Sequence, residues 1–165
     1  MSELTNLDRR RIQGEIVKPI YEELLAEVGP DKAREILSRA ITRSAVAEAR
    51  KAAEAAEGGT SMEAFTENFN RTYRNRGSEA GIEVDVLSEG PDHLDFNVTR
   101  CRFVEMYRDL GLGDIADVLS CNRDGVFAQA YDPDIDLDRA QTIAQGAPCC
   151  TFRYRFRRRG GDGRG

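Results

Sequence analysis

The chain has 165 residues, which suits one compact domain, since domains cluster at roughly 100–150 residues. Its 24 Lys and Arg residues against 29 Asp and Glu residues give a net charge of −5, so the basic excess typical of proteins that neutralise nucleic-acid phosphates is missing. No apolar run approaches the roughly 18 residues needed to cross a bilayer, and the first residues lack the pattern of a signal peptide. We therefore expect a cytoplasmic protein without a nucleic-acid or membrane partner, whose four cysteines stay reduced.

The first half of the chain has the periodicity of helices. An amphipathic helix is predicted from residue 8 to residue 28, with a kink or a break at Pro19. A second helix follows over residues 31–57, and Thr60 and Glu63 form a capping box for a third. We expect the buried face of the first helix to be the apolar row that recurs every fourth residue, Ile12, Ile16, Ile20, Leu24 and Val28.

The second half changes to the alternation of strands. Apolar residues at every second position over 82–86 and 94–98 predict a hairpin with one wet face. After helical spacing over 103–110 and a short helix over 125–131, a second hairpin is predicted, with strands at 135–143 and 150–156. The chain is thus expected to be an α+β protein, in which N-terminal helices pack on an antiparallel sheet of about four strands.

The second hairpin contains a conflict between polarity and position. Arg139 and Gln141 alternate in phase with Ile135, Leu137 and Ile143, so they are expected to point toward the apolar side. A buried guanidinium is costly unless an anionic or hydrogen-bonding group meets it. One interpretation is that Arg139 and Gln141 clamp the carboxylate of a ligand. The other is an internal ion pair of Arg139, with Asp124 as a candidate partner, and a β-bulge that reverses the alternation also remains open.

A second group of polar side chains follows Cys121, in a predicted loop that precedes the short helix. A thiol near a helix N-terminus has its thiolate stabilised, which is the usual way to activate a nucleophilic cysteine. The alternative is a small buried residue, with Asp124 capping the helix. His93 is the only histidine and is expected at the surface, so any general acid or base must be a carboxylate, a thiol or a water molecule.

Cys121 and two further thiols could together bind a metal ion. Cys101, Cys121 and Cys150 stand at the ends of elements that face the same core, and together with Asp124 they could bind zinc or another divalent ion. No close Cys-x-x-Cys pair supports this, and three separately buried thiols are the competing interpretation. No cofactor is therefore assigned with certainty.

Five blocks of the second half stand out together: Asn97–Phe103, Tyr107–Gly111, Leu119–Asp124, Leu137–Ile143 and Gly146–Tyr154. In order and spacing they resemble the L-2-amino-thiazoline-4-carboxylic acid hydrolase family. The resemblance covers roughly nine-tenths of the chain and implies a single domain over residues 1–157, followed by a disordered Arg/Gly tail over 158–165.

The resemblance implies hydrolysis of a C–N or C–S bond in a small, cyclic, amidine-like substrate that carries a carboxylate. In the namesake reaction, the thiazoline ring opens to a carbamoyl-cysteine. The implied mechanism is attack by a Cys121 thiolate or by a metal-activated water. Departures from the family pattern, such as Ala140 and Thr151, favour a related heterocycle in a biosynthetic pathway over the namesake substrate. The residues assigned to catalysis are Cys121, Asp124 and Asn122, and those assigned to substrate binding are Arg139, Gln141, Arg123 and Thr142.

The alternating aromatic residues near the C-terminus also resemble the small-molecule-binding domains related to bacteriochlorophyll four-vinyl reductase and to trafficking-complex subunits. This likeness implies the same α+β fold. It also supplies the alternative function, a ligand-binding module without catalysis that uses its cysteines structurally or to hold zinc. A homodimer formed through the N-terminal helices would suit that fold.

Overall fold

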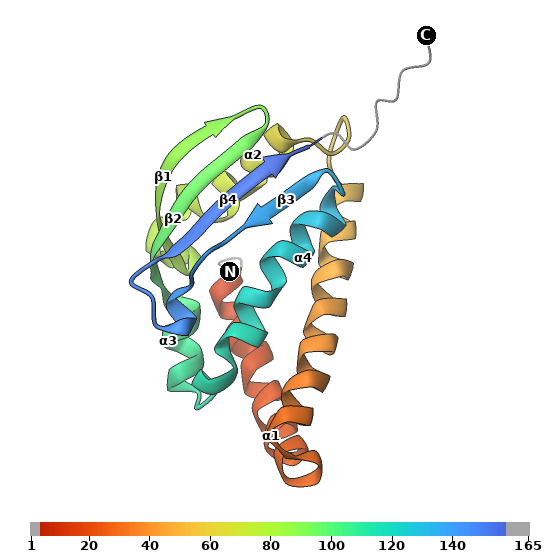
Figure 1. The fold of residues 1–165 in the computed structure, drawn as a ribbon, viewed down its shortest axis with the longest axis vertical. Coiled ribbons are helices and arrows are strands. Elements are labelled where there is room, and N and C mark those ends of the chain that lie inside the picture. The colour runs from red at the N-terminus through yellow and green to blue at the C-terminus, as the bar shows by residue number, and fades with distance from the viewer. Residues whose placement is uncertain (1–3, 158–165) are drawn as a thin grey trace.

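A computed structural model describes residues 4–157 of the chain, and the predicted Arg/Gly tail lies outside these residues. The protein has the predicted α+β fold, in which helices come first and a four-stranded antiparallel sheet follows (Figure 1). No helix in residues 4–157 is both long and apolar enough to span a membrane. The main elements are α1 (Asn6–Glu54), α2 (Met62–Thr72), β1 (Ile82–Gly90), β2 (His93–Cys101), α3 (Arg102–Asp109), α4 (Asn122–Tyr131), β3 (Ile135–Asp138) and β4 (Cys150–Phe156).

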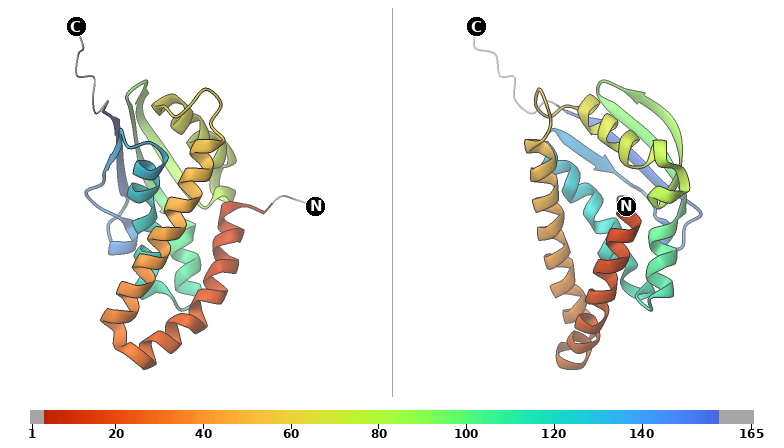
Figure 2. Two further views of the ribbon diagram at one scale, coloured as in Figure 1. Left: turned by 90° about the vertical axis from the view of Figure 1, so that its right-hand side faces the viewer. Right: turned by 180° about the vertical axis from the view of Figure 1, so that it is seen from behind.

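The long helix α1 folds back on itself at Gly29. This residue has φ 76° and ψ 171°, angles that are open to glycine but strained for other residues. Pro30 follows, and it starts the second arm well because a proline at the first helical position has no N–H to leave unpaired. The helical angles continue through Pro19, so the predicted break at that residue is wrong. The two arms lie side by side as a helical hairpin (Figure 2).

The predicted buried row of the first arm faces outward. Ile12, Ile16 and Ile20 are 48%, 61% and 49% exposed. Arg9 and Glu23, both exposed, lie seven residues before and after Ile16, on the same side of the helix as the isoleucines. The arm therefore presents an apolar row with opposite charges at its two ends. The prediction of a buried row is wrong for the three isoleucines and Val28, and only Leu24 packs against the core.

The face of the first arm that packs inward carries Arg10, Gly14 and Tyr21. Gly14 allows α3 to approach closely, since a Cβ at this position would lie 3.0 Å from a methyl carbon of Leu110. The hydroxyl of Tyr21 donates a hydrogen bond of 2.8 Å to Asp114. The first arm thus buries polar side chains that have hydrogen-bond partners, while its three isoleucines are exposed to solvent.

Helix α2 covers one face of the sheet. Its N-cap is Ser61, whose hydroxyl accepts from the backbone N–H of Ala64, so the predicted start at Thr60 is one residue too early. The ring of Phe69 stacks on that of Phe96 from β2, with centroids 4.4 Å apart. The aromatic side chains of the helix therefore form the core together with those of the sheet.

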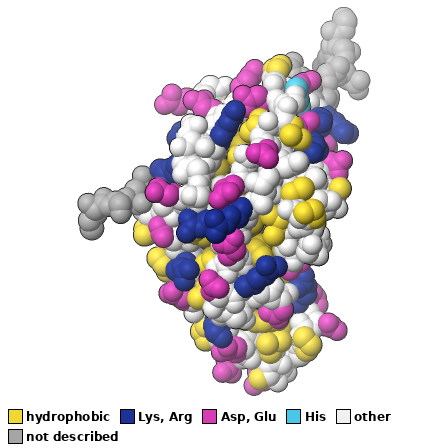
Figure 3. Space-filling view, turned by 90° about the vertical axis from the view of Figure 1, so that its left-hand side faces the viewer, with side chains coloured by type: hydrophobic (Ala, Val, Ile, Leu, Met, Phe, Trp, Pro, Cys, Tyr) yellow, Lys and Arg dark blue, Asp and Glu magenta, His cyan; other side chains and the backbone are white. Residues whose placement is uncertain are grey.

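The sheet has the strand order β1-β2-β4-β3, and every neighbouring pair is antiparallel. The first hairpin matches its prediction, with Ile82 opposite Cys101. On β2, Leu94, Phe96 and Val98 are buried, and the residues between them lie on the wetter face, where Asp95 pairs with Arg155. A space-filling view shows basic and acidic side chains intermixed on one face of the molecule, with hydrophobic side chains between them (Figure 3).

The second hairpin is shorter than predicted. Strand β3 ends at Asp138, and residues 139–142 stay hydrogen-bonded to β4 through Thr151 before a 3₁₀ turn over Ile143–Gln145. Thr142 stabilises this turn, because its hydroxyl accepts from the backbone N–H of Gln145. The half-buried Arg139 and the exposed Ala140 continue the predicted alternation just beyond β3, and Arg139 reaches the cavity side as expected.

Candidate functional site

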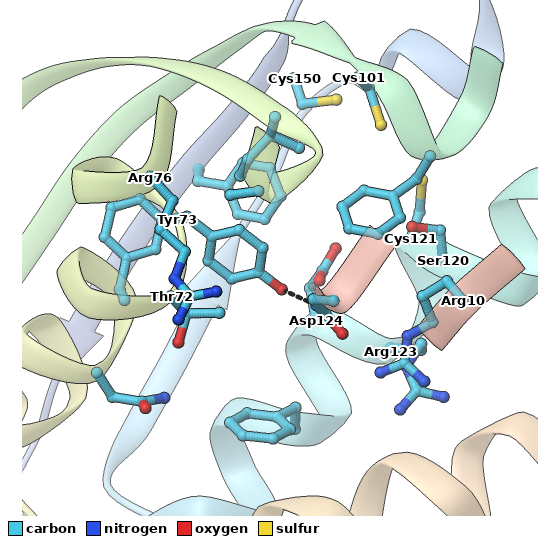
Figure 4. A pocket seen from close by; sticks show the side chains of 18 of the residues that line it. Arg10, Thr72, Tyr73, Arg76, Cys101, Ser120, Cys121, Arg123, Asp124 and Cys150 are labelled. Atoms are coloured by element: carbon cyan, nitrogen blue, oxygen red, sulfur yellow. Dashed lines mark hydrogen bonds between the residues drawn. The ribbon is translucent and has the colours of Figure 1, made fainter. Parts of the chain in front are cut away.

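A cavity of about 520 Å³ lies between the first arm of α1, α2, α4 and the buried face of the sheet. Aromatic side chains form most of its apolar wall, and its polar groups come from α1, from α4 and from α2 with the segment that follows it (Figure 4). A pocket with apolar walls and a few placed polar groups is typical of small-molecule sites. The aromatic residues that line it are Phe65, Phe69, Tyr73, Phe96, Phe103, Phe127, Phe152 and Tyr154.

Asp124 and Arg139 form an ion pair on the cavity wall. Nη1 of Arg139 lies 2.5 Å from Oδ2 of Asp124, and Nη2 donates to the carbonyl oxygen of Cys121 at 2.9 Å. The guanidinium also lies 5.2 Å from the centroid of the Phe152 ring, within the range of a cation–π contact. The segment from Cys121 thus opens into the same hollow as Arg139, as predicted, and the ion pair with Asp124 is also confirmed.

The environment of Asp124 changes its acidity. Burial raises the pKa of its carboxyl from 3.8 to about 6, against the opposing effects of Arg139, Arg123 and Arg10. Its side chain keeps 35% of its surface accessible, because it borders the cavity. A carboxyl group that takes up and releases a proton near neutral pH has the acidity that a general acid–base catalyst needs.

A second charged cluster links α1 to α4. Nη2 of Arg10 lies 2.9 Å from Oε2 of Glu48, and Nη2 of Arg123 lies 2.6 Å from the same oxygen. The two guanidiniums are nearly buried, with 10% of each side chain exposed. They lie close together on the cavity wall beside Asp124 (Figure 4).

Cys121 lies inside a helix and not in a loop. A π-helical turn over Asp117–Cys121 runs directly into α4, and Cys121 has helical backbone angles, so its thiol gains nothing from a free helix N-terminus. Asp124 caps no helix and binds Arg139 instead. Burial, followed by the nearby Asp124 carboxylate, raises the pKa of the Cys121 thiol to about 12. The predicted thiolate activation is therefore wrong.

The three thiols of the predicted metal site line the same cavity. Cys101 and Cys150 lie next to each other at one end, with Cys121 further along (Figure 4). Burial raises the pKa of Cys101 to about 11 and also raises that of Cys150. Within residues 4–157, no three His, Cys, Asp or Glu side chains are arranged so that they could hold a metal ion. The geometry thus fits buried thiols better than a metal centre.

Three predicted site residues lie away from the cavity. Asn122 borders a shallow depression on the other side of α4, which Cys121 and Arg139 also reach. The side-chain amide of Gln141 donates to the carbonyl oxygen of Cys149, and Thr142 caps the 3₁₀ turn. These contacts hold the loop between β3 and β4 and do not support direct roles in catalysis or substrate binding.

Several polar residues of the cavity were not expected from the sequence, among them Arg10, Glu48 and Tyr73. Arg10 and Glu48 come from the two arms of α1, and Tyr73 follows α2. The hydroxyl of Tyr73 accepts a hydrogen bond of 2.7 Å from the side chain of Asn6, and burial raises its pKa to about 12. The predicted apolar row placed Arg10 on the outward side of the helix, so no pattern in the sequence indicated its role.

The fold and the cavity define a small α+β domain with an aromatic, arginine-lined hollow of the size that small molecules occupy. The L-2-amino-thiazoline-4-carboxylic acid hydrolase family matches residues 9–154, and the chain belongs to that family. The crystal structure of the phenol-responsive sensory domain of the transcription activator PoxR with phenol is similar, with a TM-score of 0.54 and 16% identity. The match covers 87% of this chain and 74% of the sensory domain, and at this identity it shows the fold alone. No curated protein matches the sequence.

Proposed function

We propose that the protein is an enzyme that hydrolyses a C–N or C–S bond of a small, planar, amidine-like heterocycle bearing a carboxylate. The namesake 2-amino-thiazoline-4-carboxylate and related heterocycles belong to this class. Membership of the hydrolase family supports the reaction type, and the aromatic cavity supports a flat substrate. Six arginines and two carboxylates line the cavity, which favours an anionic ligand in a protein of net charge −5.

The observation that carries the proposal is the placement of Asp124. Its carboxyl borders the cavity and has a pKa of about 6, so it is mostly ionised at neutral pH and can accept a proton. Asp124 removes a proton from a water molecule as the water oxygen attacks the amidine carbon. The ring bond from that carbon to nitrogen or sulfur then breaks, and the leaving atom takes the proton back from Asp124. Water is thereby added across the broken bond.

Arg139 has a positioning role in this mechanism. It holds the Asp124 carboxylate through the 2.5 Å contact and favours its ionised form. A nucleophilic Cys121 is the competing route, but its thiol would have to lose a proton against a pKa of about 12. The raised pKa favours water over the thiol as the attacking group.

The test is Asp124→Asn, assayed with 2-amino-thiazoline-4-carboxylate and a panel of related carboxylated heterocycles. Ring-opened products are detected by mass spectrometry. We expect kcat to fall about 10²- to 10⁴-fold, the usual contribution of a general base. Asp95→Asn is the matched control, because it also breaks an ion pair with an arginine but lies on the sheet face away from the cavity. An Asp124→Asn variant with undiminished turnover would contradict the proposal.

The second candidate function is a ligand-binding module without catalysis. The likeness in fold to a sensory domain favours it, as does the burial that keeps the three cavity thiols protonated. In that case the heterocycles would bind, no ring-opened product would form, and Asp124→Asn would change affinity alone.

A further inference from the structure

Two buried arginines share a single carboxylate at one side of the cavity. Arg10 and Arg123 both contact Glu48, and the cluster carries a net charge of +1. In the neighbouring ion pair, the formal charges of Asp124 and Arg139 cancel. An unbalanced charge in a poorly solvated place is costly unless an anion joins it.

The surroundings show how strongly the cluster is constrained. The pKa of Arg123 is lowered by burial and by repulsion from Arg10, so the two like charges are held together against their electrostatic preference. Arg10 donates through Nη1 to Gln13 as well as to Glu48, which fixes its orientation. A rigid pair of guanidiniums suits the two oxygens of a carboxylate.

We propose that Arg10 and Arg123 form the subsite for the carboxylate of the ligand, and that Glu48 sets its preference for a single negative charge. The inference rests on the proposed function for the identity of the ligand ring. A monocarboxylate brings the cluster to zero net charge, whereas a dicarboxylate would leave it negative. The ring of the ligand then lies along the aromatic wall, beside Asp124.

This assignment differs from the clamp expected at Arg139. Both terminal nitrogens of Arg139 already donate, one to Asp124 and the other to the carbonyl oxygen of Cys121. Arg123 contributes only Nη2 to Glu48 among the contacts of the described residues, which leaves its other N–H groups for a ligand. The alternative to the subsite is a purely structural role, in which the cluster ties the two arms of α1 to α4.

Binding of matched probes separates the two roles. The probes are 2-aminothiazole-4-carboxylate and 2-aminothiazole, two aromatic rings that differ only in the carboxylate and resist hydrolysis. Titration calorimetry of the wild-type protein gives the ratio of their affinities. The ratio is the affinity for the carboxylated ring divided by that for the ring without a carboxylate. We expect Arg123→Met to lower this ratio roughly 10- to 100-fold, because charged hydrogen bonds to the carboxylate are lost. Arg34→Met is the control, because it removes an ion pair with Asp117 outside the cavity.

Glu48→Gln provides the second variant, and it tests the charge rule even if Arg123→Met folds poorly. Removing the negative charge takes the cluster to +2, so binding of 2-aminothiazole-4,5-dicarboxylate should improve at least tenfold relative to the monocarboxylate. The subsite is overturned if folded Arg123→Met keeps the wild-type affinity ratio of the two aminothiazole probes. It is also overturned if Glu48→Gln keeps the wild-type preference for the monocarboxylate over the dicarboxylate. Failure of the wild-type protein to bind the monocarboxylate also overturns it. If binding of the carboxylated probe depends on Arg123 but no heterocycle of the substrate panel is hydrolysed, the subsite is supported and the hydrolase proposal is contradicted.

Discussion

Replacing Cys121 by alanine distinguishes a thiol nucleophile from an activated water. With a pKa of about 12, only about one thiol in 10⁵ is ionised at pH 7. Asp124, with a pKa of about 6, is roughly 90% ionised at the same pH. The proposed mechanism uses the abundant carboxylate, so we expect Cys121→Ala to keep kcat/KM within about threefold of the wild-type value.

The assay is kcat/KM between pH 5 and pH 9 on a substrate of the wild-type enzyme. A general base must be ionised, so the rate should rise with pH, reach half its maximum near pH 6, and stay level above about pH 7. A thiolate nucleophile would instead give a rate that climbs about tenfold per pH unit up to pH 9. Cys150→Ala is the matched control, because it removes a second buried thiol of the same cavity.

Two results would refute the reasoning. One is a loss of 100-fold or more in Cys121→Ala while its circular dichroism and thermal unfolding match those of Cys150→Ala. The other is a wild-type rate that keeps rising through pH 9. Either outcome would restore Cys121 as the attacking group and leave Asp124 as the residue that handles its proton.

Three further predictions concern separate parts of the molecule. Arg139→Met removes a charge that lowers the pKa of Asp124, so the rising part of the kcat/KM profile should move above pH 6. If Arg139 had only a structural role, its loss would lower the rate without shifting the profile along the pH axis. Gly14→Val should lower the free energy of unfolding by about 1–3 kcal/mol in urea denaturation, because its Cβ would crowd Leu110, and an unchanged midpoint would argue against close packing there. We also expect the wild-type protein to form a concentration-dependent dimer through its exposed isoleucines in sedimentation velocity, and Ile16→Glu to prevent it. A wild-type protein that stays monomeric at every concentration would contradict this expectation.

The parts of the fold that short-range patterns determine could be predicted from the sequence. Strict alternation over 82–86 and 94–98 requires one wet and one dry face, and the hairpin of β1 and β2 has that arrangement. The first arm of α1 shows why the same reasoning failed elsewhere. Its isoleucines are outside because Arg10 and Tyr21 find partners far along the chain, and no local pattern indicates a partner such as Glu48, 38 residues away on the second arm.

The candidate site was predicted in part, and for mixed reasons. Arg139 and Asp124 were singled out together, and they form the ion pair of the cavity. Arg139 follows the end of β3, and its side chain still reaches the cavity side that the predicted alternation required. The helix N-terminus expected at Cys121 is absent because a π-helical turn continues into α4, and nothing in the local composition distinguishes such a turn from a loop.

The bend of α1 at Gly29 is a suitable site for inserting a tag or a second protein. No atom outside its immediate neighbourhood lies within 4 Å of the place where a Cβ at Gly29 would sit, so the bend projects into open space. Arg10 and Glu48, which meet across the two arms, lie on opposite sides of this bend in the sequence. A fluorescent protein or an affinity tag inserted between Gly29 and Pro30 should therefore leave the cavity intact, whereas cutting the chain there would yield two fragments whose reassembly rebuilds the charged cluster.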